Sequence, residues 1–262
     1  MSDQERGSIV LGVLVSLWVI FAIAEWFFAA GYRKSPRTGR WIRHLSLISV
    51  GALIVALMLP GGAIAAALWA QTESVGLFNY VALPPLWVYL LTWIIYDLMI
   101  YLQHRAFHAV PFLWRLHAVH HCDTSLDLSS GIRFHPVEIV LSMLFKVFVA
   151  VGLGAPPEAI AVYELILTGM ALFNHADFRL PNGLERVLRW FVVTPPMHRI
   201  HHSDRRVETD SNYGNALSLW DRLLGTYRDK PMAPLNIGLA RWRTDGDQKL
   251  TRLLGLPFRE DW

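Results

Sequence analysis

Cysteine is nearly absent from the chain, since its 262 residues include only one, Cys122. A single cysteine excludes an intramolecular disulfide and an iron–sulfur cluster held by four cysteines of this chain. Cys122 adjoins His121, so its thiol has two interpretations. It is a metal ligand, or it is a small side chain packed in the core, and we favour packing.

Charged residues are also scarce. They make up 17% of the chain, against 53% hydrophobic residues, and the mean hydropathy is +0.33. Soluble domains contain about 25% charged residues, so this composition favours a membrane protein. The net charge of +3 would suit nucleic acid binding, but the basic residues flank apolar runs. We therefore interpret them as charges that orient the chain in a membrane.

Several catalytic motifs are missing from the chain. It has no HExxH motif, which a zinc protease needs for its catalytic glutamate. It has no GxGxxG fingerprint for a nucleotide and no HPGG haem segment, because His135-Pro136 continues as Val-Glu. If the chain catalyses a redox reaction, we expect its electrons to come from an external donor.

Three apolar runs are long enough to cross a bilayer, which takes about 20 residues. They cover residues 9–30, 45–70 and 80–103, and Pro60-Gly61-Gly62 interrupts the second one. The loop 31–44 carries five basic residues, Arg33, Lys34, Arg37, Arg40 and Arg43. The loop 71–79 carries none. By the positive-inside rule, loop 31–44 is cytoplasmic.

Two further apolar runs, 137–153 and 158–174, flank Gly154-Ala155-Pro156-Pro157. We predict a helical hairpin that either spans the membrane or enters and leaves on the same side. Lys146 and Glu164 lie at similar distances from its turn, and unpaired charges in a membrane are costly. We therefore expect these two side chains to pair across the hairpin.

The predicted fold is an all-α, polytopic membrane protein with about three spanning helices plus this short hairpin. A cytoplasmic helical cap rich in histidine would hold a dimetal site. We expect residues 1–262 to form a single membrane-embedded domain. Its transmembrane helices would occupy 1–103, and its histidine-box catalytic region 104–262, which includes the hairpin 137–174.

Ten of the eleven histidines form a pattern. The spacing HxxHH occurs twice and HxxxH once, and positions i, i+3 and i+4 share one face of a helix. Two single histidines complete the set, which is His104, His108, His117, His120, His121, His135, His175, His198, His201 and His202. One metal takes four to six ligands, so ten histidines predict two metal ions. We assign His44, which lies outside the pattern, to the membrane interface.

The hairpin determines where the two single histidines lie. His135 precedes it and His175 follows it, so both are expected at the same membrane face. Ligand histidines usually direct their second ring nitrogen to a carboxylate or a carbonyl. The candidates for this supporting role are Asp97, Glu138, Asp177 and Asp204.

These boxes resemble those of the fatty acid hydroxylase/sterol desaturase superfamily of integral membrane di-iron enzymes. The matching segments are HRAFH, WRLHAVHH, RFHPVE with His135, NHAD with His175, MHRIHHSDRRVETDSNYGN and LWDRLLGTY, within about residues 93–228. In the best-known members the third pair is an HxxxH. Here His135 and His175 replace it, which is more similar to the bacterial branch of the superfamily.

The resemblance implies that the ten histidines ligate two iron ions, which zinc can replace on expression, at the cytoplasmic face of a bacterial inner membrane. It implies an O₂-dependent hydroxylase acting on an aliphatic C–H bond of a membrane lipid. A lipid desaturase and an ether-lipid monooxygenase are the near alternatives. A non-catalytic metal-binding membrane protein is the alternative from another class. The implied electron donor is a ferredoxin, a cytochrome or a flavin reductase.

Two sets of residues near the last box keep two interpretations each. Arg199, Arg205, Arg206 and Arg222 would dock an acidic donor, or they are solvated or lipid-facing side chains. Asn212, Tyr213 and Trp220 would line the mouth of the site, or they pack beneath it.

Overall fold

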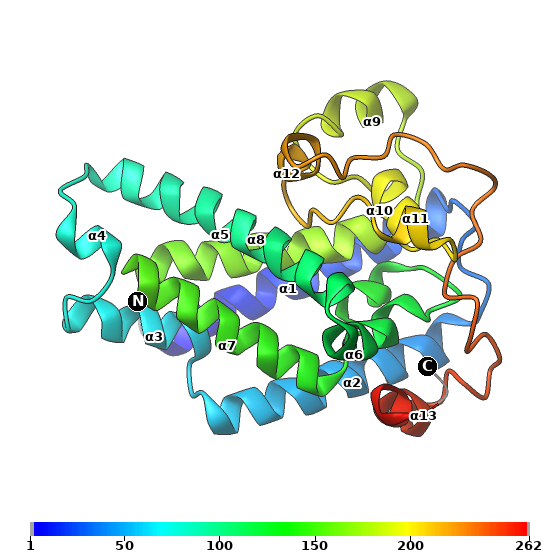
Figure 1. Ribbon diagram of the computed structural model, residues 1–262, viewed down its shortest axis with the longest axis horizontal. Coiled ribbons are helices and arrows are strands. Elements are labelled where there is room, and N and C mark those ends of the chain that lie inside the picture. Colours follow the sequence, from blue (N-terminus) through cyan, green and yellow to red (C-terminus); the bar gives the residue numbers. More distant parts are fainter. Residues whose placement is uncertain (1–2, 261–262) are drawn as a thin grey trace.

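A computed structural model describes residues 3–260 of the chain, in which the regular secondary structure is helical and no β-strand occurs (Figure 1). The helices of the N-terminal half are α1 (Asp3–Phe27), α2 (Arg37–Met58), α3 (Gly62–Thr72), α4 (Leu77–Tyr80), α5 (Pro85–Ala109), α6 (Pro111–His121) and the short 3-10 helix η1 (Leu128–Ile132). Those of the C-terminal half are α7 (Pro136–Leu153), α8 (Pro157–His175), α9 (Asn182–Leu188), α10 (Pro195–His201), α11 (Arg206–Thr209), α12 (Leu219–Leu223), α13 (Leu250–Gly255) and η2 (Leu256–Phe258). The all-α fold class is confirmed.

Four stretches are long and apolar enough to cross a membrane: Ser8–Phe27, Arg37–Tyr80, Pro85–Ala109 and Pro136–Leu153. Their outward side chains are large and apolar, as in Leu11, Leu57 and Phe148, which are 63%, 75% and 71% exposed. Exposed apolar surface on this scale is compatible with lipid and not with water. The chain is an integral membrane protein.

The predicted break at Pro60-Gly61-Gly62 separates α2 from α3, and Gly61 and Gly62 both have positive φ values. The preceding helix is longer than its apolar run suggested. It begins at Arg37, so Arg37, Arg40 and Arg43 lie on α2 and not in a loop. Its 22 residues extend over about 33 Å, enough for the hydrocarbon core.

The hairpin is confirmed as α7 and α8, joined by a turn at Gly154 with a φ of +61°. Gly154 also packs against Gly76, where an added Cβ would lie 2.1 Å from the Gly154 backbone nitrogen. The bundle core lies between this hairpin and helices α3 and α5, and it includes Ala67, Tyr96 and Tyr163.

The ion pair across the hairpin is also confirmed. The Lys146 Nζ lies 2.7 Å from the Glu164 Oε2. The pair lies beside Tyr96, whose hydroxyl donates to the Lys146 carbonyl oxygen.

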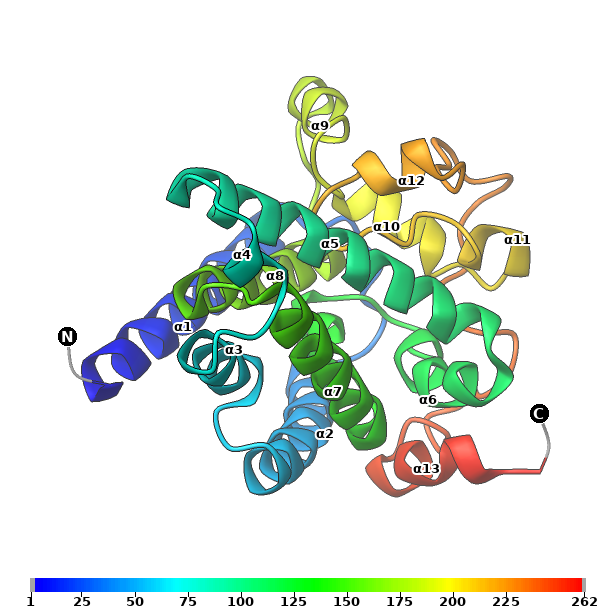
Figure 2. The ribbon, with the colours of Figure 1, turned by 60° about the vertical axis from the view of Figure 1, so that its left-hand side comes forward.

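The ends of α5 and α8 lie at one end of the bundle, where α6, α10, α11 and α13 gather (Figures 1 and 2). The connections after α8 are mostly irregular, with short helices. This arrangement forms the predicted cap, and it places the histidine boxes on neighbouring helix ends.

Replacing Lys146 or Glu164 singly by Leu is expected to destabilise the protein by about 3 kcal/mol, because the remaining charge loses its partner in an apolar environment. Replacing both should cost less than either single change. Thermal unfolding in detergent measures the stability of the two single variants and the double variant. Equal stabilities of single and double variants would contradict a role for the pair.

Candidate metal centre

The histidine boxes lie at four helix ends. His104 and His108 are on the last turns of α5, and His175 ends α8. One HxxHH box occupies the last turns of α6, and the other occupies the last turn of α10 and its C-cap residue, His202; each is a short helix that begins at a proline. Proline is favoured in the first helical turn because its missing N–H has no partner to lose there.

Nine of the ten predicted ligands converge in two groups, within each of which the potential ligand atoms lie within 4.8 Å of one another. The five-histidine group contains His104, His108, His117, His121 and His201. The four-histidine group contains His120, His175, His198 and His202. All nine are buried except His104, which is partly buried.

Each HxxHH box contributes to both groups. On α6, the i and i+4 positions, His117 and His121, belong to the five-histidine group, while His120 belongs to the other. On α10 the assignment is reversed, because His201 alone joins the five-histidine group. The ends of α6 and α10 therefore face each other, and each of these helices provides histidines to both groups.

Backbone carbonyls determine which ring nitrogen carries the proton in four of the histidines. The Nδ1 atoms of His104 and His201 lie 2.7 Å from the Tyr213 and Ser211 carbonyl oxygens, respectively. In the four-histidine group, the Nδ1 atom of His120 lies 3.2 Å from the Arg133 carbonyl oxygen. The Nδ1 atom of His175 lies 2.7 Å from the Ala171 carbonyl oxygen. A carbonyl oxygen only accepts, so each Nδ1 carries the proton and each neutral ring has a bare Nε2 lone pair.

These bare Nε2 atoms face one another. The His104 and His201 Nε2 atoms are 3.1 Å apart, and so are those of His120 and His175. Two acceptors at this distance cannot form a hydrogen bond with each other. A cation between them would satisfy both lone pairs, and each group contains one such pair.

Other buried nitrogens also lack a partner. Neither ring nitrogen of His121 has a hydrogen bond among residues 3–260, nor has the His108 Nε2 atom. Burying a polar atom unpaired costs about 1–3 kcal/mol. Burial also lowers the pKa of His117 to about 3 and that of His121 well below its ordinary value. The rings are thus neutral, which is the form that binds a metal. The two groups fit two metal ions of the imidazole-binding kind.

Carboxylates support two rings of the five-histidine group. The His117 Nδ1 atom lies 2.6 Å from the Glu138 Oε1 atom, as expected for a supporting carboxylate. The His108 Nδ1 atom lies 3.2 Å from the Asp210 Oδ1 atom, a contact that the sequence did not predict. Asp210 lies in a polar run where nothing local distinguishes it from Asp204.

The other three carboxylate candidates have different partners. Asp97 accepts hydrogen bonds from the Tyr163 hydroxyl and the Trp220 indole. Asp177 accepts from two backbone N–H groups, and Asp204 from the Asn236 side chain. In residues 3–260 none of the three forms a hydrogen bond with a histidine ring, so the structure does not bring them to the rings and their supporting role stays a prediction.

His135 lies outside both groups. It caps the N-terminus of α7, where its Nδ1 accepts from the Val137 backbone N–H at 3.2 Å. Its Nε2 lies 3.2 Å from the Leu254 carbonyl oxygen. Both nitrogens are therefore occupied, and the expectation that His135 binds metal is not met. The hairpin returns His135 and His175 to the same end, but α7 begins at Pro136, and His135 as its N-cap directs its ring to the start of that helix.

Tyr213, Trp220 and Cys122, which lie near the boxes in the sequence, pack within the protein around the centre. The Tyr213 ring contacts those of His104, His108 and His201, while the Trp220 indole binds Asp97. Cys122 is buried and lies outside both groups, so packing was the correct interpretation.

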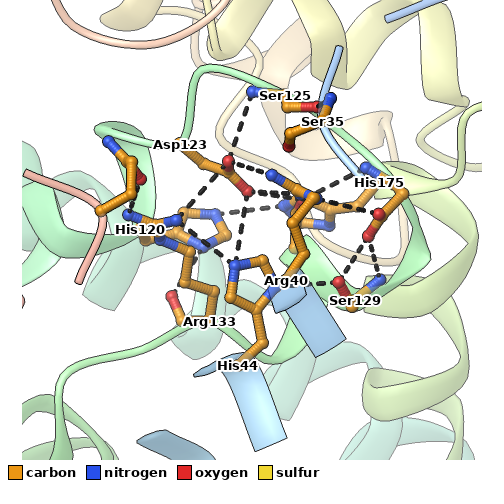
Figure 3. Close-up of polar contacts among 12 residues, drawn as sticks. Ser35, Arg40, His44, His120, Asp123, Ser125, Ser129, Arg133 and His175 are labelled. Carbon is orange, nitrogen blue, oxygen red and sulfur yellow. Dashed lines mark hydrogen bonds and ion pairs between the residues drawn. The ribbon is translucent and has the colours of Figure 1, made fainter. Parts of the chain in front are cut away.

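A buried ionic network supports the four-histidine group from behind (Figure 3). Arg40 of α2 binds both oxygens of Asp123, at 2.6 and 2.8 Å, and its Nε donates to Asp127 at 3.0 Å. Burial alone would raise the pKa of Asp123, but Arg40 and Arg133 hold it below its ordinary value. Arg133 also provides the carbonyl that orients His120. The network therefore connects a membrane helix to a histidine of the centre.

Two residues of this network were interpreted differently from the sequence. Arg40 was counted among the charges that orient the chain, and His44 was assigned to the membrane interface. Both are buried, and the His44 Nδ1 atom lies 2.8 Å from the Ser129 hydroxyl. A basic residue on a helix has no local signal that distinguishes a buried ion pair from a loop charge.

Comparison with known proteins identifies the family. The family model described as fatty acid hydroxylase matches residues 89–226, slightly more than half of the chain. The chain belongs to the fatty acid hydroxylase family. The matched region contains all nine histidines of the two groups.

Curated members of this wider superfamily are similar to part of the chain. An ornithine lipid hydroxylase from Rhizobium tropici is 31% identical over 138 residues, which are 53% of this chain and 41% of that protein. An alkylglycerol monooxygenase from Homo sapiens is 27% identical over 216 residues, 81% of this chain and 46% of that protein. A lathosterol oxidase from Mus musculus is 29% identical over 133 residues, 50% of this chain and 42% of that protein.

The chain spans less than half the length of each of these three fatty acid hydroxylase relatives. No solved structure is significantly similar to it.

Replacing His120 or His198 by Ala is expected to lower the metal bound per chain by about half, because one group loses a ligand and weakens at least about 10-fold. The matched control is His135→Asn, since asparagine is also a good helix N-cap. Elemental analysis of the purified variants checks this. A loss in His135→Asn as large as in His198→Ala would contradict the assignment.

Proposed function

We propose that this fatty acid hydroxylase family member is an O₂-dependent hydroxylase that uses two iron ions to oxidise an aliphatic C–H bond of a membrane lipid. One observation carries the proposal: each of two adjacent histidine groups contains a pair of bare Nε2 atoms 3.1 Å apart. A single ion could not serve nine imidazoles, and two ions in one centre suit the reduction of O₂.

In this proposal the residues of the centre have different roles. The five-histidine and four-histidine groups hold the two ions, and bound iron supplies the oxidising power that no side chain has. Glu138 and Asp210 orient His117 and His108 and make those rings better ligands. Eight of the nine histidines are buried, which would keep most water from the centre and limit unproductive side reactions.

The substrate class follows from the position of the centre and from the relatives. The histidines lie where α5 and α8 end, next to a membrane from which a lipid chain would reach them directly. The names of the three relatives refer to three different lipids, namely ornithine lipid, alkylglycerol and lathosterol. They support a lipid C–H bond as the target without favouring one lipid.

The reaction needs two electrons from outside the chain. Hydroxylation consumes one C–H bond, one O₂, two electrons and two protons, and yields the alcohol and water. Desaturation uses the same reductant but yields a double bond and two waters. We propose a ferredoxin, a cytochrome or a flavin reductase as the donor, acting at the cytoplasmic face of a bacterial inner membrane, where the charge pattern of the sequence would place the cap.

The basic side chains near the last box are mostly occupied. Arg199 is buried and donates to the Ala176 and Phe178 carbonyl oxygens. Arg206 binds Asp210 at 2.6 Å and lies over the Trp114 ring. Arg206 also donates to the carbonyl oxygen of His108, at 2.8 Å, so a donor that docks on Arg206 would lie next to a histidine of the centre.

A second function is favoured by the four-histidine group. Four imidazoles match the tetrahedral coordination of a structural zinc site. A non-catalytic metal-binding membrane protein would retain zinc and show no reductant-dependent O₂ uptake after iron reconstitution. An iron-reconstituted hydroxylase would consume O₂ when a reductant and lipid are supplied.

Membranes from cells that express the wild-type chain are expected to contain a lipid shifted by about +16 mass units, the mass of one oxygen atom, which His198→Ala membranes lack. The variant loses a ligand of the four-histidine group while keeping its membrane helices. Comparative lipid mass spectrometry measures the shift. A loss of about 2 mass units would indicate desaturation, and identical lipid profiles would contradict both reactions.

A further inference from the structure

Helices α9 and α12 together present a large apolar surface. Six side chains on or next to them are 41–66% exposed, and we call this surface the α9–α12 face. Its members are Leu184, Val187, Trp190, Phe191, Leu219 and Leu223. The two helices are held side by side, because the Ser218 backbone N–H donates to the Phe191 carbonyl and Arg222 donates to the Arg189 carbonyl.

This face lies beside the membrane helices. Trp220 of α12 donates to Asp97, which lies seven residues before His104 on α5. Asn215 donates to the carbonyl of Leu167, which lies eight residues before His175 on α8. Seven to eight helical residues correspond to about 10–12 Å.

The chain therefore descends from the histidine centre along the outside of the bundle, and α12 lies against the membrane-spanning part of α5. In Figures 1 and 2, α12 lies on the side of the C-terminal half of α5, and α9 projects further out from the bundle. Side chains that extend outward at this level continue the lipid-facing surface of α5.

A basic cleft adjoins the face. Its volume is about 690 Å³, and its lining includes Arg186, Arg189, Arg222 and Lys230. Arg189 is neutralised by Glu185 and Asp229. Among residues 3–260, neither Arg186 nor Lys230 has an ion pair.

Arg222 is held in place by two aromatic rings. Its guanidinium carbon lies 4.2 Å from the Trp190 ring centroid and 3.8 Å from that of Tyr227. Its Nε atom is buried and has no hydrogen-bond partner among the described residues, and its positive charge lies at the wall of the cleft.

Apolar side chains beside a tryptophan and several cations are typical of a surface that lies in the lipid headgroup boundary. We infer that the α9–α12 face inserts into the leaflet nearest the histidine centre, and that the basic cleft binds the headgroup of an anionic phospholipid there. The cap would then be fixed to the bilayer beside the centre, independently of the substrate.

The insertion is tested by attaching nitroxide labels to Val187→Cys and Leu223→Cys in the intact protein in nanodiscs of phosphatidylcholine with phosphatidylglycerol. Native Cys122 is buried, and wild-type protein treated with the same reagent shows that it does not react. Phe148→Cys on α7 provides the lipid reference and Thr244→Cys the aqueous reference.

At both positions we expect the label to be accessible to oxygen and shielded from a water-soluble nickel complex, as at Phe148→Cys. Accessibility to nickel, as at Thr244→Cys, at either position would overturn the inference. So would shielding from both reagents, which would indicate a protein partner.

The headgroup site is tested by the double variant R186Q/K230Q, with Arg252→Gln on α13 as the matched control. Native mass spectrometry measures the phosphatidylglycerol retained relative to phosphatidylcholine. The ratio should fall at least about fivefold in the double variant, since each cation near an anionic surface strengthens binding by about that factor.

An unchanged ratio in the double variant, or an equal fall in the control, would overturn the headgroup assignment. Neither the label nor the lipid measurement requires turnover, so these results are independent of the proposed reaction.

Discussion

Bare nitrogen lone pairs that face each other in a buried centre constrain this structure more than any other interaction. The His104–His201 pair and the His120–His175 pair are each held at 3.1 Å. Backbone carbonyls hold the protons on the far side of all four rings. Without cations, these atoms would repel one another and remain unsolvated. Metal binding and folding of the cap are therefore expected to be coupled.

The rest of the fold places these rings. Helices α5 and α8 bring histidines to one end of the bundle, and the two short helices α6 and α10 face each other across the centre. Arg40 and Asp123 then connect α2 to the loop behind His120. Arg40 lies outside the region that defines the family, 89–226. The scaffold of the centre thus extends beyond the histidine boxes into the N-terminal membrane helices.

Much of the centre could be predicted from the sequence because its spacing is local. The i, i+3 and i+4 positions of a helix share a face, so two HxxHH boxes and one HxxxH pair were sufficient to predict eight of the nine converging histidines. The ninth, His175, followed from the hairpin. The assignment of each histidine to a group could not be predicted, because it depends on how α6 and α10 face each other.

The predictions that the structure does not bear out also concern tertiary contacts. His135 was expected beside His175 because the hairpin returns both to one end, but the orientation of a ring at a helix N-terminus depends on its capping hydrogen bond. Glu138 was proposed because it is three residues from His135, yet the ring that it contacts is that of His117. Arg40, His44 and Asp210 depend on tertiary contacts between segments far apart in sequence, for which one sequence contains no signal.

The most direct test of the account is anomalous X-ray scattering at the iron edge from crystals of the iron-loaded protein. Two separate peaks are predicted, one within the five-histidine group and one within the four-histidine group, with no peak at His135. A single peak shared by both groups, or a peak bound by His135, would contradict the account.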